Sequence, residues 1–389
     1  MKFKLCFVTG SRAEYGLLRP LMEEIKRDEQ FDLQIIVTGM HLSTEYGLTF
    51  QEIVADGFAI DKKIEILLSS DTPIGVSKAM GLAFISFAEA YAELNPDLLI
   101  VLGDRFETFS AVACAQTNRI PVAHLHGGEL TEGAIDDSMR HCITKMSHLH
   151  FTSAEKYRQR VIQLGENPET VFNVGAIGLD NILNLKLLKK DELERQLGFL
   201  FGKKNVLVTF HPVTLDDNTA SLQFEALLSV LDENKDIFVI FTKANADNGG
   251  RLINQMIDKY AEDRQERCSV HTSLGSLKYL SILQYVDAVV GNSSSGILEA
   301  PSFKIGTVNI GDRQKGRIIT ESVINCEPNK ESITDAFIEI YSNDFQKKLL
   351  TVQNPYGKGE TAQKIHAIIK THLSHEKIKI KKAFFDLKS

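Results

Sequence analysis

The sequence predicts an α/β protein made of two domains, each with a parallel sheet that is covered by helices on both faces. Short apolar runs alternate with amphipathic helical patterns along the chain, and this order is typical of a parallel sheet. The runs are almost continuously apolar, as expected for strands that are buried on both faces. The length of 389 residues also exceeds what one hydrophobic core normally holds, which favours two domains.

The first half of the chain holds one series of strand and helix patterns. The clearest strand is the run at 98–102, five apolar residues that stop at a glycine. The expected strands lie at residues 3–8, 33–37, 98–102, 120–125 and 171–175, with a further strand ending at 151–153. The expected helices lie at residues 17–26, 78–94 and 155–164, others begin near residues 106 and 136, and residues 48–65 hold a helix and a short strand.

The pattern changes between residues 175 and 203, and we place the domain boundary near residue 178. Residues 186–195 are rich in charge and have a helical pattern. A second series follows, with strands expected at residues 206–210, 238–241, 288–291 and 307–311. The lysine-rich tail from residue 375 onward predicts a docked terminal helix with a solvated basic face.

Composition and charge exclude several classes of function. The net charge of -7 argues against a nucleic-acid partner. No apolar run reaches membrane-spanning length and the N-terminal run is too short for a signal peptide, so we expect a cytoplasmic protein without a membrane partner. The 5 cysteines are scattered without zinc spacing, and the glycines lack the dinucleotide fingerprint. We therefore expect reduced thiols, no metal and no NAD.

Carboxylates follow two strands of the first domain at the points where these strands end, and two more open the next helix. Ligands of open α/β sheets bind outside the carboxyl ends of the strands, so these groups are expected to meet at one edge. Together with neighbouring arginines they predict acid–base chemistry on a charged ligand. The alternative is that each carboxylate caps a helix or pairs with an arginine. The carboxylates are Asp104, Glu129, Asp136 and Asp137, and the arginines are Arg105 and Arg140.

Two further strand ends of the first domain carry candidate binding residues. Residues 9–16 form a strand-to-helix turn whose glycine lets the backbone approach a ligand. Arg12 in this turn could grip a phosphate, and a purely structural turn is the alternative. His41 also lies at a strand end, where a structural histidine is the alternative to a substrate contact.

A serine-rich turn in the second domain predicts a phosphate-binding loop. Residues 291–296 read Gly-Asn-Ser-Ser-Ser-Gly between a strand and a helix, where backbone N–H groups and hydroxyls can receive a diphosphate. Ordinary N-capping by serine is the alternative. His211 closes another strand and could protonate or hydrogen-bond a departing phosphate oxygen. The remaining residues assigned to nucleotide binding are Asn245, Ser293, Ser294, Ser295, Glu299 and Arg313.

Taken in order, these motifs resemble those of the hydrolysing UDP-N-acetylglucosamine 2-epimerases, bacterial enzymes that make N-acetylmannosamine for sialic acid. The matching motifs lie at residues 12–15, 103–106, 126–129, 136–141, 211–214 and 291–294, so the resemblance covers nearly the whole chain. The non-hydrolysing relatives carry Gly-Thr-Arg-Pro-Glu at the first turn and Gly-Asp-Thr at the second. This chain has Gly-Ser-Arg-Ala-Glu and Gly-Asp-Arg there, and it departs from its own branch with Glu14 in place of an aspartate.

The resemblance implies the GT-B arrangement, in which two Rossmann-like domains face each other across a cleft and a C-terminal helix returns to the first domain. It thus implies a catalytic domain of residues 1–178 together with about 356–389, and a UDP-binding domain of residues 179–355. It also implies that no cofactor is needed and that the protein is a homodimer or a homotetramer.

The reaction that the resemblance implies converts UDP-N-acetylglucosamine and water to N-acetylmannosamine and UDP. Departure of UDP gives C1 oxocarbenium character, which acidifies the C2 proton, so elimination to a glycal precedes hydration. On this resemblance, catalytic carboxylates match Asp104, Glu129, Asp136 and Asp137, nucleotide-binding positions match His211, Ser294, Ser295 and Glu299, and cleft residues match Arg12 and Arg105. Together with the positions at strand ends, we expect catalysis from Asp104, Glu129, Asp136, Asp137 and His211, and substrate or UDP binding from Arg12, His41, Arg105, Arg140, Asn245, Ser293, Ser294, Ser295, Glu299 and Arg313.

Three alternatives to this function stay open at the level of sequence. A hydrolysing epimerase of a UDP-2,4-diacetamido-trideoxy sugar, in the legionaminic acid pathway, would share every motif. A GT-B glycosyltransferase would need an acceptor and would not liberate free sugar in water. A non-catalytic nucleotide-sugar sensor would bind UDP and release none.

Overall fold

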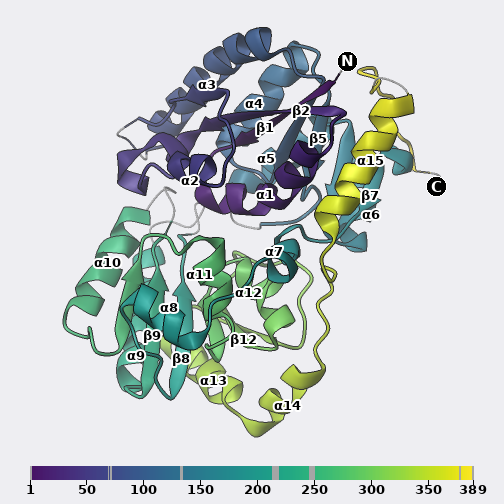
Figure 1. Ribbon diagram of the computed structural model, residues 1–389. Coiled ribbons are helices and arrows are strands. Elements are labelled where there is room, and N and C mark those ends of the chain that lie inside the picture. The colour runs from purple at the N-terminus through teal and green to yellow at the C-terminus, as the bar shows by residue number, and fades with distance from the viewer. Residues whose placement is uncertain are drawn as a thin grey trace. The chain divides into compact units, whose positions relative to one another are not determined.

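The computed structural model divides the chain into two compact units (Figure 1). Unit 1 comprises Met1–Glu129, Asp136–Leu183 and Tyr356–Ser389, and unit 2 comprises Leu130–Ile135 and Asn184–Pro355. The residues that the structure describes are 2–68, 70, 72–131, 135–212, 219–244, 250–375 and 378–387. The sequence-based boundary near residue 178 falls at the start of a short helix, Gly178–Asn184, in which Asn181 donates a hydrogen bond to the Gly16 carbonyl.

Unit 1 is built on a seven-stranded sheet with the order β3-β2-β1-β4-β5-β6-β7. All neighbouring strands are parallel. The strand order grows outward from β1 in one direction and from β4 in the other, so the switch point of this sheet lies between β1 and β4. The strands are β1 (Phe3–Thr9), β2 (Phe31–Thr38), β3 (Lys62–Ile64), β4 (Leu98–Leu102), β5 (Val122–Leu125), β6 (Leu149–Thr152) and β7 (Val171–Asn173).

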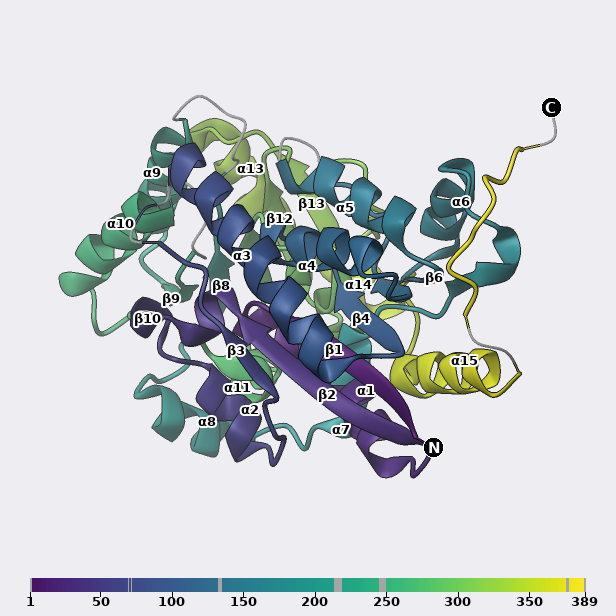
Figure 2. The ribbon, with the colours of Figure 1, turned by 90° about the horizontal axis from the view of Figure 1, so that it is seen from above.

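Helices cover both faces of this sheet, and alternate residues of β1 point to different helices. Leu5 and Phe7 belong to the core cluster that α1 and α15 complete, whereas Cys6 and Val8 belong to the cluster with α3 and α4. Figure 2 shows α3 and α4 side by side over the strands. The helices are α1 (Arg12–Arg27), α2 (Phe50–Ala55), α3 (Pro73–Leu94), α4 (Phe106–Thr117), α5 (Ile135–Met146), α6 (Glu155–Gln163), α7 (Gly178–Asn184) and α15 (Thr361–His375), with 3-10 turns η1 (Gly39–Leu42), η2 (Thr44–Tyr46) and η3 (Pro168–Thr170).

Unit 2 has a six-stranded sheet with the order β10-β9-β8-β11-β12-β13, again with all neighbours parallel. Its switch point lies between β8 and β11. The strands are β8 (Lys204–Thr209), β9 (Ile237–Thr242), β10 (Cys268–His271), β11 (Ala288–Gly291), β12 (Gly306–Ile310) and β13 (Val323–Cys326). The helices are α8 (Lys190–Leu197), α9 (Ala220–Glu233), α10 (Gly250–Glu262), α11 (Gly275–Ile282), α12 (Ser295–Leu298), α13 (Lys330–Ile340) and α14 (Asn343–Thr351), with η4 (Ala300–Phe303).

The prediction of an α/β protein with two parallel sheets is confirmed, and the differences lie in single elements. Strands β10 and β13 were not predicted from the sequence, because both are edge strands that are only partly buried and therefore lack a continuous apolar run. The helix expected at residues 186–195 begins at Lys190 and ends at Leu197.

The helix predicted for the tail is wrong for the part of the tail that the structure describes. Residues 378–387 contain no helix. Specific contacts hold this segment in a non-helical path instead. The Lys382 ammonium donates to the Glu166 carboxylate at 2.7 Å, and the Phe385 N–H donates to the Gly165 carbonyl at 3.0 Å.

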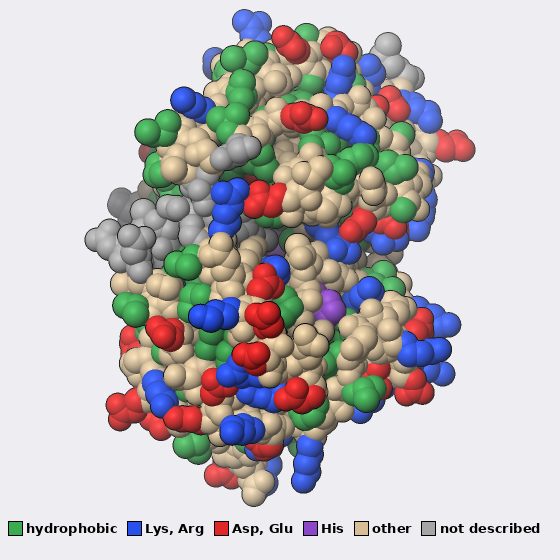
Figure 3. All heavy atoms as spheres, turned by 90° about the vertical axis from the view of Figure 1, so that its left-hand side faces the viewer, with side chains coloured by type: hydrophobic (Ala, Val, Ile, Leu, Met, Phe, Trp, Pro, Cys, Tyr) green, Lys and Arg blue, Asp and Glu red, His purple; other side chains and the backbone are tan. Residues whose placement is uncertain are grey.

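The surface mixes both signs of charge. On the face shown in Figure 3, acidic and basic side chains lie next to one another, with hydrophobic side chains between them. Within the described ranges, none of the helices combines the length and the apolar character that a bilayer crossing requires.

Candidate active site

Arg140 gathers the first group of predicted site residues at the carboxyl edge of the unit 1 sheet. This arginine comes from α5 and is 4% exposed. Its guanidinium donates to the Asp104 carboxylate after β4 and to the His126 carbonyl after β5, the latter at 3.0 Å. Burial lowers the pKa of Arg140, but the charges of Asp104, Glu129 and Asp137 outweigh burial and leave that pKa raised. Arg140 is therefore a permanent buried cation between strand ends.

Glu129 is held from three directions. Its carboxylate accepts from the Ser153 hydroxyl at 2.5 Å, lies 3.1 Å from the His126 ring nitrogen Nδ1, and lies 3.8 Å from Arg140. The residue is only 1% exposed. The expected meeting of Asp104 and Glu129 at one edge is thus present in the structure, and it occurs through shared contact with Arg140. A carboxylate fixed in this way is well placed for proton transfer.

Asp136 and Asp137 occupy the first turn of α5 and are partly buried. A helix N-terminus favours negative charge at this position. Asp137 lies 3.6 Å from the His141 ring nitrogen Nε2, one turn further along the helix. Burial lowers the pKa of His141, and Asp137 opposes this effect. The charge of Asp137 also acts on Arg140, so the start of α5 belongs to the same charged region.

A second charged group lies at the switch point between β1 and β4. Arg105 after β4 makes a two-pronged contact with Glu107, with Nε–Oε2 and Nη2–Oε1 distances of 3.2 and 3.3 Å. Glu14 after β1 accepts from the Gly10 N–H at 2.6 Å. Burial, together with the nearby Glu107 charge, raises the pKa of Glu14 to about 7. This group therefore contains a carboxyl that titrates near neutral pH.

The two remaining predicted residues of unit 1 have different surroundings. Arg12 opens α1 and forms an ion pair with Glu52 at 2.7 Å. His41 is fully buried, and its ring nitrogens contact the Thr9 and Thr49 hydroxyls at 3.1 and 2.8 Å. Burial lowers the pKa of His41 to about 4. A neutral imidazole between two hydroxyls favours the structural alternative for this residue.

In unit 2, Asn292 organises the switch point between β8 and β11. Its side chain accepts from the His211 N–H and donates to the His211 carbonyl, both at 2.7 Å. The backbone carbonyl of Asn292 accepts from Arg313 at 3.1 Å and from Gln314 at 2.8 Å. Gly291 permits this arrangement, since a Cβ there would lie 2.0 Å from the Thr209 carbonyl oxygen and its φ is +125°. Asn292 thus joins His211 and Arg313, two residues predicted from sequence.

The serine-rich turn follows directly. Ser294 is the N-cap of α12, and the Ser295 hydroxyl accepts from the Tyr279 hydroxyl at 2.6 Å. Burial raises the pKa of Tyr279, and the charge of Glu299 adds to this effect. The helix expected after this turn is a short α12 of 4 residues. With so short a helix, any anion held at this turn would be bound by individual N–H groups and hydroxyls, including those of Ser293.

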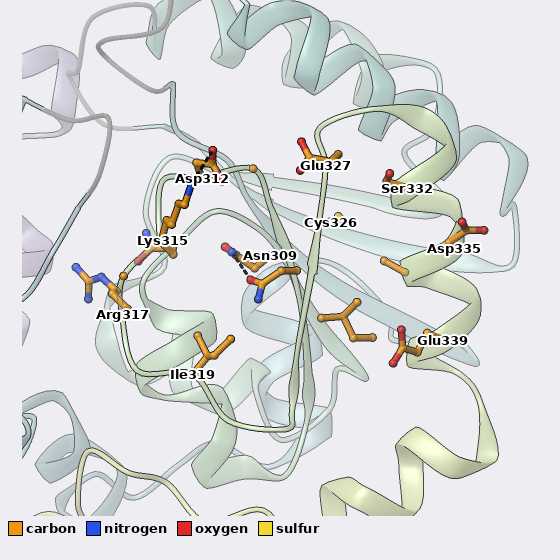
Figure 4. A pocket seen from close by; sticks show the side chains of 16 residues that line it. Asn309, Asp312, Lys315, Arg317, Ile319, Cys326, Glu327, Ser332, Asp335 and Glu339 are labelled. Atoms are coloured by element: carbon orange, nitrogen blue, oxygen red, sulfur yellow. Dashed lines mark hydrogen bonds and ion pairs between the residues drawn. The ribbon is translucent and has the colours of Figure 1, made fainter. Parts of the chain in front are cut away.

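A pocket of about 540 Å³ lies next to this region of unit 2, between the loop after β12, strand β13 and helix α13 (Figure 4). Asn309 donates to Asn325 at 2.8 Å on its floor, and Lys315 approaches Asp312 at its rim. Glu327, Asp335 and Glu339 line the opposite side (Figure 4). This pocket does not include the serine turn.

Sequence reasoning did not select four residues that the structure places in these groups. Glu107 lies two residues beyond the predicted Arg105. His126 and Asn292 lie inside the motifs at residues 126–129 and 291–294, so position in or next to a motif was the available signal. Tyr279 offered no such signal. Asn245, assigned to binding from the sequence, lies outside the described residues. Among the described residues, no group of three or more histidine, cysteine, aspartate or glutamate side chains has an arrangement that would hold a metal ion.

Comparison with known proteins assigns the family. The family model for UDP-N-acetylglucosamine 2-epimerase matches residues 23–370. The GDP/UDP-N,N'-diacetylbacillosamine 2-epimerase (hydrolyzing) of Campylobacter jejuni is 46% identical over 346 residues, 89% of this chain and 89% of that protein. Polysialic acid biosynthesis protein P7 of Escherichia coli is 38% identical, with 99% of this chain and 97% of that protein covered. The UDP-N,N'-diacetylbacillosamine 2-epimerase (hydrolyzing) of Legionella pneumophila is 37% identical, with coverages of 96% and 97%.

A solved structure carries the same fold. The UDP-GlcNAc 2-epimerase of Neisseria meningitidis, in a crystal structure with bound UDP-GlcNAc, matches with a TM-score of 0.80 at 17% identity, and 96% of this chain and 100% of that chain are covered. The match of the family model over residues 23–370, together with these relatives, shows that the chain belongs to the UDP-N-acetylglucosamine 2-epimerase family.

Proposed function

We propose that this chain is a hydrolysing 2-epimerase of a UDP-2,4-diacetamido-trideoxy sugar, UDP-N,N'-diacetylbacillosamine. The observation that carries the proposal is the 46% identity, over 89% of this chain, to the Campylobacter relative of that activity. The Legionella relative, 37% identical, has the same sugar in its name. The relatives thus favour the diacetamido sugar over UDP-N-acetylglucosamine, the first expectation from the sequence.

The chemistry of such a reaction explains why carboxylates are needed. The C2 proton is not acidic until the C1–O bond begins to break. In the first step, the electron pair of that bond leaves on the UDP oxygen, a base takes the C2 proton, and a C1–C2 double bond forms. In the second step, water adds its oxygen to C1 and a proton returns to C2 from the opposite face. The products are UDP and the free 2-epimer.

The unit 1 groups offer the proton donors and acceptors for both steps. Glu129, fixed by Ser153 and His126, is the proposed base or acid at C2. Asp104, whose side chain is 19% exposed, is proposed to act beside it near C1. Asp136 and Asp137 at the start of α5 are proposed to activate water.

Unit 2 is proposed to hold the nucleotide. The Ser293–Ser295 hydroxyls and N–H groups would receive the diphosphate, and Glu299 would accept from the ribose hydroxyls. His211, whose backbone is held by Asn292, would donate a hydrogen bond to the departing phosphate oxygen. Arg105 of unit 1 is proposed to contact the substrate as a fixed cation.

The test is a direct comparison of nucleotide sugars. The purified chain is incubated with UDP-N,N'-diacetylbacillosamine, its GDP-linked counterpart and UDP-N-acetylglucosamine, each without an acceptor. Nucleotide release is followed by coupled assay, and the free sugar is identified by NMR. We expect the diacetamido sugar to give the highest kcat/KM, with equal amounts of nucleotide and 2-epimerised sugar. Nucleotide release from UDP-N-acetylglucosamine but not from the diacetamido sugars would contradict the proposed substrate.

UDP-N-acetylglucosamine is the second candidate substrate. It is favoured by the 38% identity to polysialic acid biosynthesis protein P7 over 99% of this chain. The same assay separates the remaining alternatives. A glycosyltransferase would release nucleotide only with an acceptor, and a sensor would bind UDP without releasing it from any sugar. Sedimentation in the same buffer tests the predicted homodimer or homotetramer.

A further inference from the structure

We propose that Glu107 is a positioning residue of the active site, whose buried carboxylate fixes the Arg105 guanidinium at the β1–β4 switch point for contact with the nucleotide sugar. The inference rests on the proposed function, because Arg105 is assigned there to substrate contact. Glu107 belongs to no motif selected from the sequence, and its role follows from where the fold places it.

The geometry of the pair is specific. Arg105 donates through Nε to Oε2 and through Nη2 to Oε1, at 3.2 and 3.3 Å. Two parallel N–H···O contacts fix both the position and the plane of a guanidinium. The Arg105 side chain is 18% exposed, whereas that of Glu107 is 1% exposed. The carboxylate is therefore buried, whereas part of the arginine side chain stays accessible.

The backbone around Glu107 is shaped to admit it. A Cβ at Gly39 would lie 2.7 Å from Glu107 Oε1, and Gly39 has a φ of +56°. Gly10 lies on the other side, where a Cβ would be 3.5 Å from three carbons of the same side chain. A Cβ at Gly10 would make only ordinary contacts at this distance, so the glycine that leaves space for the carboxylate is Gly39, which follows β2.

The electrostatics of Glu107 argue against a purely structural role. Glu107 lies near a second buried carboxyl, Glu14, and its charge helps to raise the pKa of Glu14. Two acidic groups side by side in a buried place disfavour folding, and a buried ion pair is often no more stabilising than apolar residues of the same size. Such an arrangement is typical of a site where charge is kept for function at the expense of stability.

A double-mutant cycle tests the proposal. Arg105→Ala, Glu107→Gln and the double variant are compared with the wild type, using kcat/KM and the calorimetric Kd for UDP-N,N'-diacetylbacillosamine. Glutamine keeps the size of Glu107 and removes its charge. We expect Glu107→Gln to lower kcat/KM by about 10-fold and Arg105→Ala to lower it by about 100-fold. In the Arg105→Ala background, Glu107→Gln should cause no further loss, since Glu107 acts through Arg105.

Thermal unfolding separates positioning from structure. Glu107→Gln should keep or raise the melting temperature while activity falls. The matched control is Glu166→Gln, which removes a carboxylate that is 2% exposed and bonded to Lys145 and Lys382 away from these strand ends. It should lower the melting temperature and leave kcat/KM unchanged.

Each outcome bears on the proposal. Independent losses that multiply in the double variant would overturn the positioning role, and so would loss of activity in proportion to loss of stability. If the wild type binds the nucleotide sugar but does not hydrolyse it, the proposed function fails, and the same cycle measured in Kd still decides the role of Glu107. If the sugar does not bind at all, both proposals fall.

Discussion

The switch points of the two sheets are held together by different chemistry. Between β1 and β4, the groups that meet are charged: Arg105, Glu107 and Glu14 lie at strand ends with little exposure. Between β8 and β11, the central group is the amide of Asn292, which bonds the backbone of His211 in both directions. A buried charge responds to its neighbours and to pH, whereas an amide bonded to backbone does not titrate.

This difference between the two switch points fits the different roles proposed for the two units. Unit 1 concentrates charged side chains around Arg140 and around Glu107. At the unit 2 switch point the central group is a neutral amide, which would hold its neighbours in the same way before and after bond breaking. Substitutions in the two units should therefore change different properties, turnover in unit 1 and UDP affinity in unit 2. The following predictions test that difference in order of expected effect.

The largest effect is expected for the carboxylates of unit 1. Asp104→Asn, Glu129→Gln and Asp137→Asn should each lower kcat by about 10²- to 10⁴-fold, because each removes a proton donor or acceptor without changing shape. Since unit 2 is intact, calorimetry should show unchanged UDP affinity. Near-normal turnover in all three variants would refute the catalytic role proposed for unit 1.

Asn292→Ala should impair UDP binding and stability rather than the chemical step. The substitution leaves the His211 N–H and carbonyl without their partner, at about 1–3 kcal/mol of unfolding free energy for each group. UDP affinity should fall as well, by about 10-fold, because the His211 backbone loses the side chain that holds it, while Arg313 keeps its acceptor, the backbone carbonyl of residue 292. Chemical denaturation and calorimetry measure the two effects.

Asn205→Ala is the matched control for this prediction. Asn205 bonds the Gly202 N–H and carbonyl at 2.7 and 3.1 Å in the same two-way manner, but at the start of β8. The Asn205→Ala variant should have a lower free energy of unfolding and an unchanged affinity for UDP. Equal loss of UDP affinity in both variants would show that the Asn292 contact acts through stability alone.

Glu14 should make the stability of the protein depend on pH. Its pKa is raised from 4.5 to about 7 in the folded protein, mainly by burial, with Glu107 adding to this and Arg105 opposing it. The folded state therefore binds the proton more tightly, and stability falls as pH rises from about 4.5 to about 7. The full effect is at most roughly 3 kcal/mol. Glu14→Gln should flatten this slope in denaturation curves at a series of pH values, and an unchanged slope would contradict the assignment.

The smallest effect is expected at His41. The His41→Gln variant should lose about 1 kcal/mol of unfolding free energy, through weaker contacts with the Thr9 and Thr49 hydroxyls. Its KM for the nucleotide sugar should match that of the wild type. A raised KM with unchanged stability would instead restore His41 to the substrate site.

The fold was predictable wherever burial is complete. Strand β4 has the predicted bounds, since all 5 of its residues are buried and apolar. The edge strands β10 and β13 were missed because half-exposed strands tolerate polar residues. In the site, strand ends correctly indicated that Asp104 and Glu129 meet. Glu107 was not predictable, because the space for its carboxylate depends on Gly39, which is distant in sequence and close only after the sheet has formed.

The docking of α15 on unit 1 has a consequence for biosynthesis. Its residues Ile365, Ile369 and Leu373 complete the same hydrophobic cluster as Leu5 and Phe7, and Lys370 bonds Asp28 beside α1. A ribosome therefore delivers the last part of this core only after residues 184–355 have emerged. Until then the nascent first half lacks the apolar side chains with which α15 covers Leu5 and Phe7 in the folded protein.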